Sequence, residues 1–180
     1  AAIIGHMTST MTKAVLPFIN QEKVLMISPT TSMNKLAGID DYFIRVLPSQ
    51  ELTNKYQARY TYRTLGLRNV AIIYELTNFV FTEMVFKEFS SEFKAMGGKI
   101  AGISTFTSGP DVSYVQIAKK LIQFQPDGLM IVGGAIDVAM ISQHIRMTNS
   151  DIPILSVGWA MTKELLRYGG PAVEGMIFTN

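Results

Sequence analysis

The sequence predicts an α/β fold made of right-handed βαβ units, in which helices connect parallel strands. Short apolar runs alternate with amphipathic stretches along the 180 residues, which is the pattern of βαβ connections. Most runs are continuously apolar, as is typical of parallel strands covered on both faces. Two runs end in clusters of hydroxyl residues, around Ser9 and around Thr31. These clusters place polar groups at the carboxyl ends of adjacent strands.

Eight strands are expected, one at each short apolar run. They cover residues 2–5, 24–27, 42–46, 70–74, 100–106, 128–132, 154–157 and 175–179. Six amphipathic helices are expected between them, at residues 10–22, 50–65, 78–96, 115–124, 136–147 and 162–168.

The helix boundaries rest on spacing, proline and glycine. Pro17 lies inside helix 10–22 and predicts a kink there. Helix 78–96 has the clearest signature, because Phe81, Val85, Phe89 and Phe93 recur every four residues and Gly97-Gly98 suits a C-cap.

Pro48 separates strand 42–46 from helix 50–65, and proline interrupts either element. We interpret this segment as a hinge between two lobes. An ordinary turn between strand and helix is the alternative.

Composition excludes several function classes. The chain is 48% hydrophobic with a net charge of +2 and has no dense Lys/Arg run, so nucleic acid is not an expected partner. It has no cysteine, which excludes disulfides and thiolate metal sites. No metal or cofactor is expected, because His6 and His144 lack ligand spacing and no dinucleotide or P-loop motif is present. No Ser/His/Asp arrangement appears either, so the chain is not expected to be an enzyme.

The two hydroxyl clusters point to a small anionic ligand. Open α/β sheets bind ligands at the carboxyl ends of their strands, and helix N-termini there favour anions. Ser9 and Ser32 could instead be simple helix N-caps.

Several segments resemble a known family. Residues 5–10 (Gly-His-Met-Thr-Ser-Thr) and 25–32 (Leu-Met-Ile-Ser-Pro-Thr-Thr-Ser) look like the two ligand loops of the type I periplasmic solute-binding proteins of the leucine/isoleucine/valine-binding group. Residues 41–45, 111–128 and 170–175 resemble later segments of that family in the same order. The resemblance covers nearly the whole chain, and the Met-Ile-Ser-Pro stretch is its most specific part.

The resemblance implies two Rossmann-like lobes, each a three-layer αβα sandwich, flanking a cleft that closes on the ligand. Residues 1–48 would be part of the first lobe, 49–178 most of the second, and 179–180 the start of a return crossover. The chain opens in a strand-like run without an initiator Met, so both ends are expected to be cut from something longer. The partial first lobe is expected to expose sheet edges and apolar faces.

The resemblance also implies the site. In the first lobe, Ser9, Thr30, Thr31 and Ser32 would bind a ligand carboxylate without a buried counter-charge. In the second lobe, Phe79 would pack on the apolar part of the ligand, although it could instead belong to the helix core with Phe81.

Two positions depart from the amino-acid-binding pattern. Ala135 stands where those members place an aromatic residue, and Gly158 stands where they place the acid that pairs with the ligand ammonium. Because an unpaired buried ammonium is costly, the ligand is either a hydrophobic amino acid with another partner, such as Asp137 or Glu75, or an amine-free acid. Trp159 could stack on a flat ligand or belong to the core.

The expected function is therefore the ligand-binding component of a bacterial ATP-driven (ABC) importer. It would act in the periplasm or tethered at the cell surface, and a membrane permease would recognise its closed state. The same fold could serve as the sensing domain of a larger receptor, and an α/β enzyme is the weaker alternative.

Overall fold

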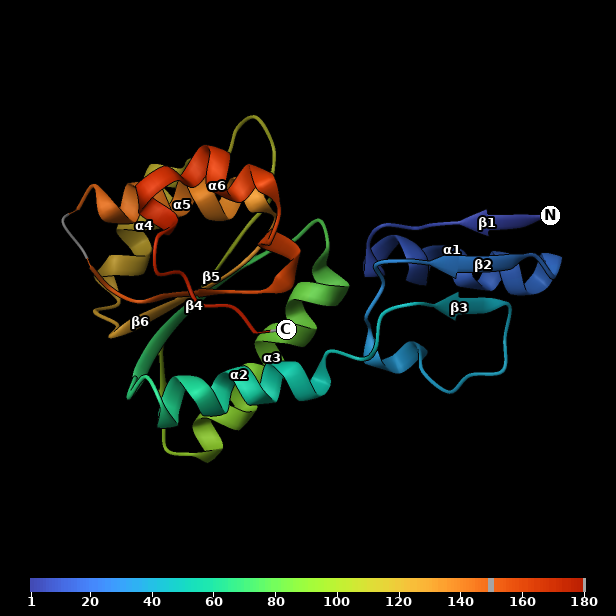
Figure 1. Ribbon diagram of the computed structural model, residues 1–180, viewed down its shortest axis with the longest axis horizontal. Helices are drawn as coiled ribbons and strands as arrows, with labels where there is room; N and C mark the ends of the chain where they lie inside the picture. The colour runs from blue at the N-terminus through green and yellow to red at the C-terminus, as the bar shows by residue number, and fades with distance from the viewer. Residues whose placement is uncertain (149–150, 180) are drawn as a thin grey trace.

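The computed structural model describes residues 1–148 and 151–179, and it contains two separate parallel sheets (Figure 1). The part around the first sheet is called the first lobe here, and the part around the second sheet the second lobe. Asn180, the last residue of the predicted return crossover, lies outside the described residues. The two parallel sheets with intervening helices confirm the predicted α/β class.

The first lobe is a three-stranded sheet with one helix. Its strands lie in the order β1 (Ala2–Ile4), β2 (Leu25–Ser28) and β3 (Phe43–Arg45). Helix α1 (Ser9–Glu22) remains one helix through Pro17. The short 3-10 helix η1 (Asn34–Leu36), which sequence did not predict, follows β2.

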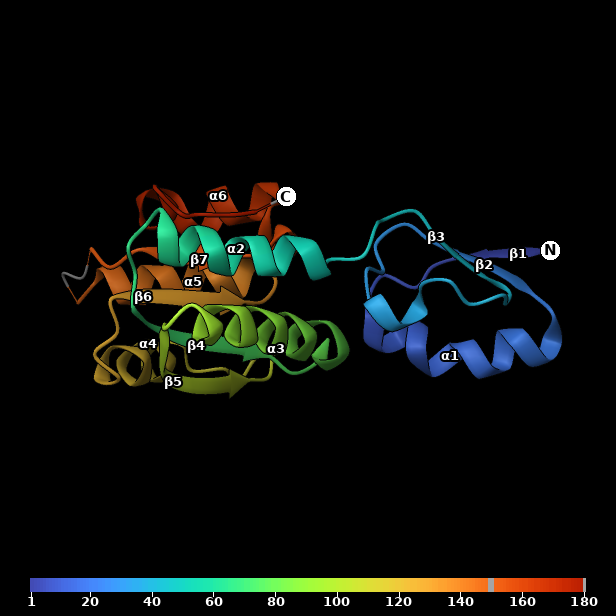
Figure 2. The same ribbon diagram turned by 90° about the horizontal axis from the view of Figure 1, so that it is seen from below.

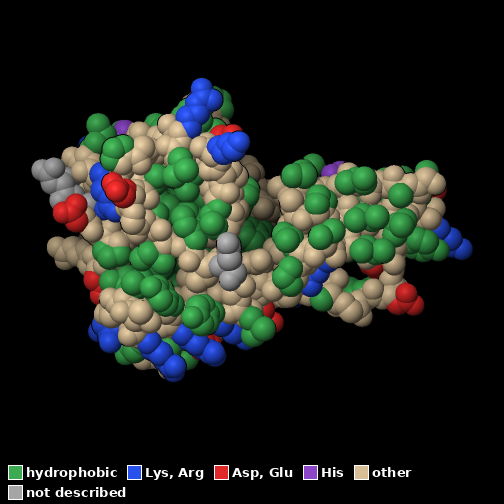
Figure 3. All heavy atoms as spheres, in the orientation of Figure 1, with side chains coloured by type: hydrophobic (Ala, Val, Ile, Leu, Met, Phe, Trp, Pro, Cys, Tyr) green, Lys and Arg blue, Asp and Glu red, His purple; other side chains and the backbone are tan. Residues whose placement is uncertain are grey.

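The strand register in the first lobe separates a covered face from an open one. Ile3, Met26 and Phe43 are register partners, and Met26 and Phe43 form a small core with Ile19 of α1. The next register row, Ile4, Ile27 and Ile44, lies on the opposite face, where Ile4 is 83% exposed. Hydrophobic side chains crowd this face (Figure 3). The expectation of an exposed apolar face is confirmed, whereas the expectation that these strands are covered on both faces is wrong within the described residues.

The second lobe has three layers. Its four parallel strands lie in the order β5-β4-β6-β7, with the bounds β4 (Asn69–Glu75), β5 (Lys99–Phe106), β6 (Gly128–Val132) and β7 (Ile154–Ser156). One face carries α2 (Glu51–Arg63) and α3 (Phe79–Ala95), and the other carries α4 (Tyr114–Gln123), α5 (Ala135–Arg146) and α6 (Lys163–Gly169) (Figure 1). Two further 3-10 helices, η2 (Gly158–Ala160) and η3 (Gly170–Val173), flank α6.

The core of the second lobe is divided between the two faces of its sheet. Ile72 and Met130 pack with Phe89 and Phe93 beneath α2 and α3. Ile73 and Ile131 pack with residues of α4 and α5 on the other face. The alternation along β4 and β6 follows from the period of two in a strand, and burial on both faces explains their continuous apolar runs.

The predicted strand 175–179 is wrong as a full strand. Only an isolated parallel bridge joins Leu155 to Ile177, with hydrogen bonds from the Ser156 N–H to the Ile177 carbonyl and from the Ile177 N–H to the Ile154 carbonyl, both 2.9 Å. Its apolar composition favours a strand, but a strand also needs continued pairing with a neighbour.

Candidate functional site

The carboxyl ends of the strands of both sheets point toward the boundary between the lobes (Figures 1 and 2). The loops after β1 and β2 reach this boundary from the first lobe, and the N-termini of α3 and α5 reach it from the second. This is the edge at which open α/β sheets bind ligands.

Hydrogen bonds tie the two first-lobe loops together. The Ser28 hydroxyl lies 2.9 Å from both the His6 carbonyl oxygen and the Thr31 hydroxyl. Thr30 donates its hydroxyl to the Met7 carbonyl at 2.8 Å. The Thr31 hydroxyl is buried and also lies 2.7 Å from the Thr12 hydroxyl. The side chain of Thr31 therefore supports the loops, and its contact with a ligand stays a prediction.

Ser9 and Ser32 are different, because their hydroxyls have no hydrogen-bond partner within residues 1–148 and 151–179. Both residues are buried. The alternative that Ser9 and Ser32 are helix N-caps is wrong, because Thr8 is the N-cap of α1 and Met33 is the N-cap of η1. Among the described residues, the buried side-chain atoms without a partner are Gln57 Oε1 and Ser90 Oγ, so the hydroxyls of Ser9 and Ser32 still reach solvent. Both hydroxyls are therefore free to donate to another molecule, and their contact with a ligand carboxylate stays a prediction.

The second lobe carries the two aromatic residues that are predicted to meet the ligand, Phe79 and Trp159. Phe79, the first residue of α3, is 41% exposed, whereas Phe81 and Val85 are buried. Phe79 therefore lies outside the helix core, which removes the alternative reading for it. Trp159 is half-buried and packs edge-on against Phe81, with ring centroids 6.0 Å apart.

Ala135 and Gly158 are the two positions that depart from the amino-acid-binding pattern, and each begins a helical element. Ala135 is the first residue of α5, and Gly158 is exposed at the start of η2. A Cβ added to Gly134 would lie 3.8 Å from the Trp159 ring. Trp159 therefore lies beside the turn before α5, and ligand contacts at Ala135, Gly158 and Trp159 stay predictions.

Sequence reasoning missed a contact between the lobes at this boundary. The Val80 N–H, in the first turn of α3, donates to the Thr10 hydroxyl of α1 at 3.1 Å. Asn78, which precedes α3, makes no side-chain cap of its own. Thr10 thus caps a helix of the other lobe. The only signal in the sequence was the position of Thr10 within the first hydroxyl cluster.

Glu75 is fully buried at the end of β4 and accepts three backbone hydrogen bonds. The N–H groups of Thr77, Asn78 and Ser108 donate to it at 2.6, 2.9 and 3.4 Å. Burial alone would raise the pKa of Glu75, but the hydrogen bonds from these residues outweigh burial and lower it. Glu75 therefore holds the loops at the boundary as a carboxylate.

Glu75→Gln should lower the free energy of unfolding by about 2 kcal/mol at pH 7, because the amide replaces an ionised acceptor of several N–H groups. A lowered folded pKa stabilises the fold above the unfolded pKa, near 4.5, and this stabilisation is lost as the pH falls through the folded value. Urea unfolding from pH 7 to pH 3 should show the difference between the two proteins shrinking below pH 4.5. A constant difference over this range would contradict the assignment.

Asp137 lies in the first turn of α5 and is also engaged. Its Oδ2 accepts from the Ser108 hydroxyl at 2.7 Å and its Oδ1 from the Tyr114 hydroxyl at 2.8 Å. Burial, followed by the contact with Asp137, raises the pKa of Tyr114, so this hydroxyl stays protonated as a donor. Both carboxylates considered as ammonium partners are thus held by donors of the protein itself.

A pocket of about 340 Å³ lies between the lobes, next to the hydroxyl loops. Of the eight predicted site residues only Phe79 lines it, together with Lys13, Met33, Asn34, Lys35, Val80, Glu83, Met84, Lys87 and Glu88. Lys87 pairs with Glu83 at 2.9 Å. Ser9 and Ser32 do not line this pocket, and the carboxylate contacts predicted for them stay predictions.

Fold and site together define a class: a two-lobe α/β protein whose parallel strands end at a shared, hydroxyl-lined boundary. A family model described as periplasmic binding protein matches residues 1–180. The chain therefore belongs to the periplasmic binding protein family. In the described residues, no helix is both long and apolar enough to cross a membrane, and no three His, Asp or Glu side chains are grouped to hold a metal.

Solved structures share this fold. A leucine binding protein, LivK, from Thermotoga maritima is 26% identical with a TM-score of 0.86, and the match covers 99% of this chain and 50% of that one. LivJ from Streptococcus pneumoniae, in complex with isoleucine, is 20% identical with a TM-score of 0.85, over 98% and 50% of the two chains.

A solute binding protein from R. palustris in complex with benzoate is 16% identical with a TM-score of 0.84, over 98% of this chain and 48% of that one. The chain thus spans about half the length of these structures. A comparison with curated protein sequences gave no significant match.

Proposed function

We propose that this chain is part of the extracytoplasmic solute-binding component of an ABC importer, located in the periplasm or tethered at the cell surface. It binds a small carboxylate-bearing ligand between its lobes and delivers it to a membrane permease. The observation that carries this proposal is the pair of solvent-accessible hydroxyls on the otherwise buried residues Ser9 and Ser32, which have no hydrogen-bond partner among the described residues. The family match and the ligand-bound relatives support it.

In this mechanism the carboxylate accepts hydrogen bonds from Ser9 and Ser32, while the remaining body of the ligand meets Phe79 and Trp159. The lobes turn about a hinge near Pro48, with residues 1–48 in the first lobe and 49–178 in the second. Contacts from both lobes favour the closed state. A sensing domain of a larger receptor would bind its ligand in the same way, and an attached signalling domain would distinguish it.

We further propose that the ligand lacks an α-amine. Gly158 offers no carboxylate, and Glu75 and Asp137 already accept hydrogen bonds from the protein. An ammonium beside Gly158, Glu75 or Asp137 would therefore be buried without a free carboxylate, which is costly. The benzoate-bound relative shows that the fold accommodates an amine-free aromatic acid.

A thermal-shift screen of the full gene product tests this proposal. Leucine, valine and phenylalanine are compared with 4-methylpentanoate, 3-methylbutanoate, 3-phenylpropanoate and benzoate. At 100 times the Kd, a ligand adds about 2.7 kcal/mol, which corresponds to a rise in Tm of about 5–10 °C. We expect this rise with amine-free acids alone.

A rise with leucine or valine would overturn the amine-free assignment and make Asp137 the first residue to mutate. No rise with any of these compounds would overturn the carboxylate site itself.

A further inference from the structure

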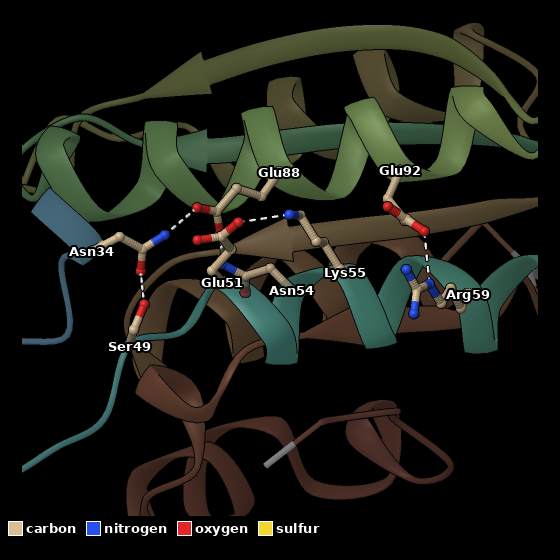
Figure 4. Close-up of polar contacts among 8 residues, drawn as sticks. All are labelled: Asn34, Ser49, Glu51, Asn54, Lys55, Arg59, Glu88 and Glu92. Carbon is tan, nitrogen blue, oxygen red and sulfur yellow. Dashed lines mark hydrogen bonds and ion pairs between the residues drawn. The ribbon is translucent and has the colours of Figure 1, made fainter.

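A polar cluster connects the two lobes (Figure 4). It lies beside the segment that links them, residues 46–50 between β3 and α2, which is called the linking segment below. Asn34 of η1 belongs to the first lobe, and its Nδ2 donates to Oε1 of Glu88 on α3. Ser49, which lies just before α2, donates its hydroxyl to Oδ1 of the same Asn34. The side-chain amide of this first-lobe residue therefore bonds both to the linking segment and to the second lobe.

Both ends of this connection are held in place. Glu88 is half-buried, and its other oxygen, Oε2, accepts from Asn54 Nδ2 of α2 at 2.7 Å. On the first-lobe side, Arg45 Nη1 donates to the Met33 carbonyl at 2.6 Å, immediately before Asn34. Since Ser32 directly precedes Met33, the loop that carries the proposed carboxylate donor ends at this connection.

The neighbouring ion pairs in Figure 4 have a different role, because each lies within the second lobe. Lys55 pairs with Glu51 along α2, and Arg59 pairs with Glu92 between α2 and α3, both at 2.6 Å. The bonds of this cluster that leave the first lobe are therefore those of Asn34, to Glu88 and to Ser49.

The lobes also meet where Thr10 contacts Val80, at the N-terminus of α3. Val80 and Glu88 are eight residues apart on one helix, which corresponds to about 12 Å along its axis. The two contacts therefore hold α3 at separate points. The contact at Glu88 adjoins the linking segment, whereas the contact at Val80 adjoins Ser9 and Phe79.

We propose that Asn34 is a positioning residue that sets the resting angle between the lobes. Its amide holds α3 and the linking segment at a constant distance from the ligand loop. Ligand affinity then depends on Asn34 although Asn34 does not touch the ligand; this part rests on the proposed function.

The test uses a reciprocal pair of substitutions in the full gene product. Asn34→Asp keeps the acceptor for Ser49 but places a carboxylate against the Glu88 carboxylate. Adding Glu88→Gln restores the bond in the reversed direction, because the new amide at position 88 can donate to the carboxylate at position 34. The amide oxygen at position 88 can still accept from Asn54. Glu92→Gln is the matched control, since it breaks an ion pair one turn further along α3 without changing a contact between the lobes.

The readout is the distance between spin labels at Glu22→Cys on α1 and Lys119→Cys on α4, both exposed. The 180 residues contain no other cysteine to label. In the ligand-free protein, Asn34→Asp should shift the distance distribution to longer values, and the double variant should return it. Affinity for whichever acid gives a thermal shift should fall about tenfold and recover in parallel, and Glu92→Gln should change neither.

An unchanged distance distribution in Asn34→Asp would overturn the proposal, as would a shift that Glu88→Gln fails to reverse. Because the distance is measured without ligand, these outcomes are independent of whether a carboxylate binds at all.

Discussion

Replacing both Ser9 and Ser32 with alanine should weaken the binding of a carboxylate ligand by at least about 100-fold. A hydrogen bond to a charged group contributes about 1.5–3 kcal/mol, and each 1.4 kcal/mol is a factor of ten in affinity. Titration calorimetry on the full gene product, with an acid identified by thermal shift, measures the loss. Each single substitution should account for roughly half of it on a free-energy scale.

The same double variant should unfold at an unchanged denaturant concentration when no ligand is present. The two hydroxyls have no partners among the described residues, so the folded protein loses no hydrogen bond. Ser91→Ala, on the exposed face of α3, is the control for a serine outside the site. Affinity within threefold of the unmodified protein would place the carboxylate elsewhere.

Phe89→Ala should lower the free energy of unfolding of the second lobe by about 4 kcal/mol, the usual cost of removing a buried phenylalanine. Phe89 is fully buried at the centre of α3. Its ring stacks on Phe93 with centroids 5.5 Å apart. The substitution removes this contact and leaves a cavity between α3 and the sheet, and urea unfolding followed by circular dichroism measures the cost.

Phe18→Ala is the matched control, because Phe18 is 60% exposed on α1 and should change the free energy of unfolding by less than about 0.5 kcal/mol. Equal effects of the two substitutions would contradict the burial of Phe89. Since α3 also carries Phe79, Val80 and Glu88, Phe89→Ala should weaken ligand binding as well, through loss of a rigid helix at the boundary.

The periodicity of side chains predicted most of the elements. The repeat from Phe81 to Phe93 predicted α3 within one residue at each end, because a helix that packs on a sheet must bury one stripe of its surface. The apolar run at 128–132 predicted β6 with the observed bounds. The prediction of a strand at 175–179 was wrong because a strand depends on continued pairing with a neighbour, and the composition of a segment does not reveal whether a neighbour is present.

At the site, sequence identified the loops but not the roles of all their hydroxyls. Ser9, Thr31 and Ser32 look alike in the sequence, yet the Thr31 hydroxyl is bonded to its neighbours, while those of Ser9 and Ser32 have no partner in the part of the chain that the structure describes. The alternative that Ser9 and Ser32 are N-caps is wrong. An N-cap is the residue with non-helical backbone angles just before a helix, and Thr8 and Met33 occupy those positions. Direct ligand contacts stay predictions at all eight residues: Ser9, Thr30, Thr31, Ser32, Phe79, Ala135, Gly158 and Trp159.

The sequence by itself determined the fold class, the parallel strands and the two hydroxyl loops, because each of these follows from local composition and spacing. Only the tertiary structure decided which hydroxyls are unpaired, that Glu75 and Asp137 are already engaged, and that the lobes meet through Thr10 with Val80 and Asn34 with Glu88. These partners are 70 and 54 residues apart, and no local pattern specifies a hydrogen bond across that separation. It forms only when packing brings α3 against the first lobe.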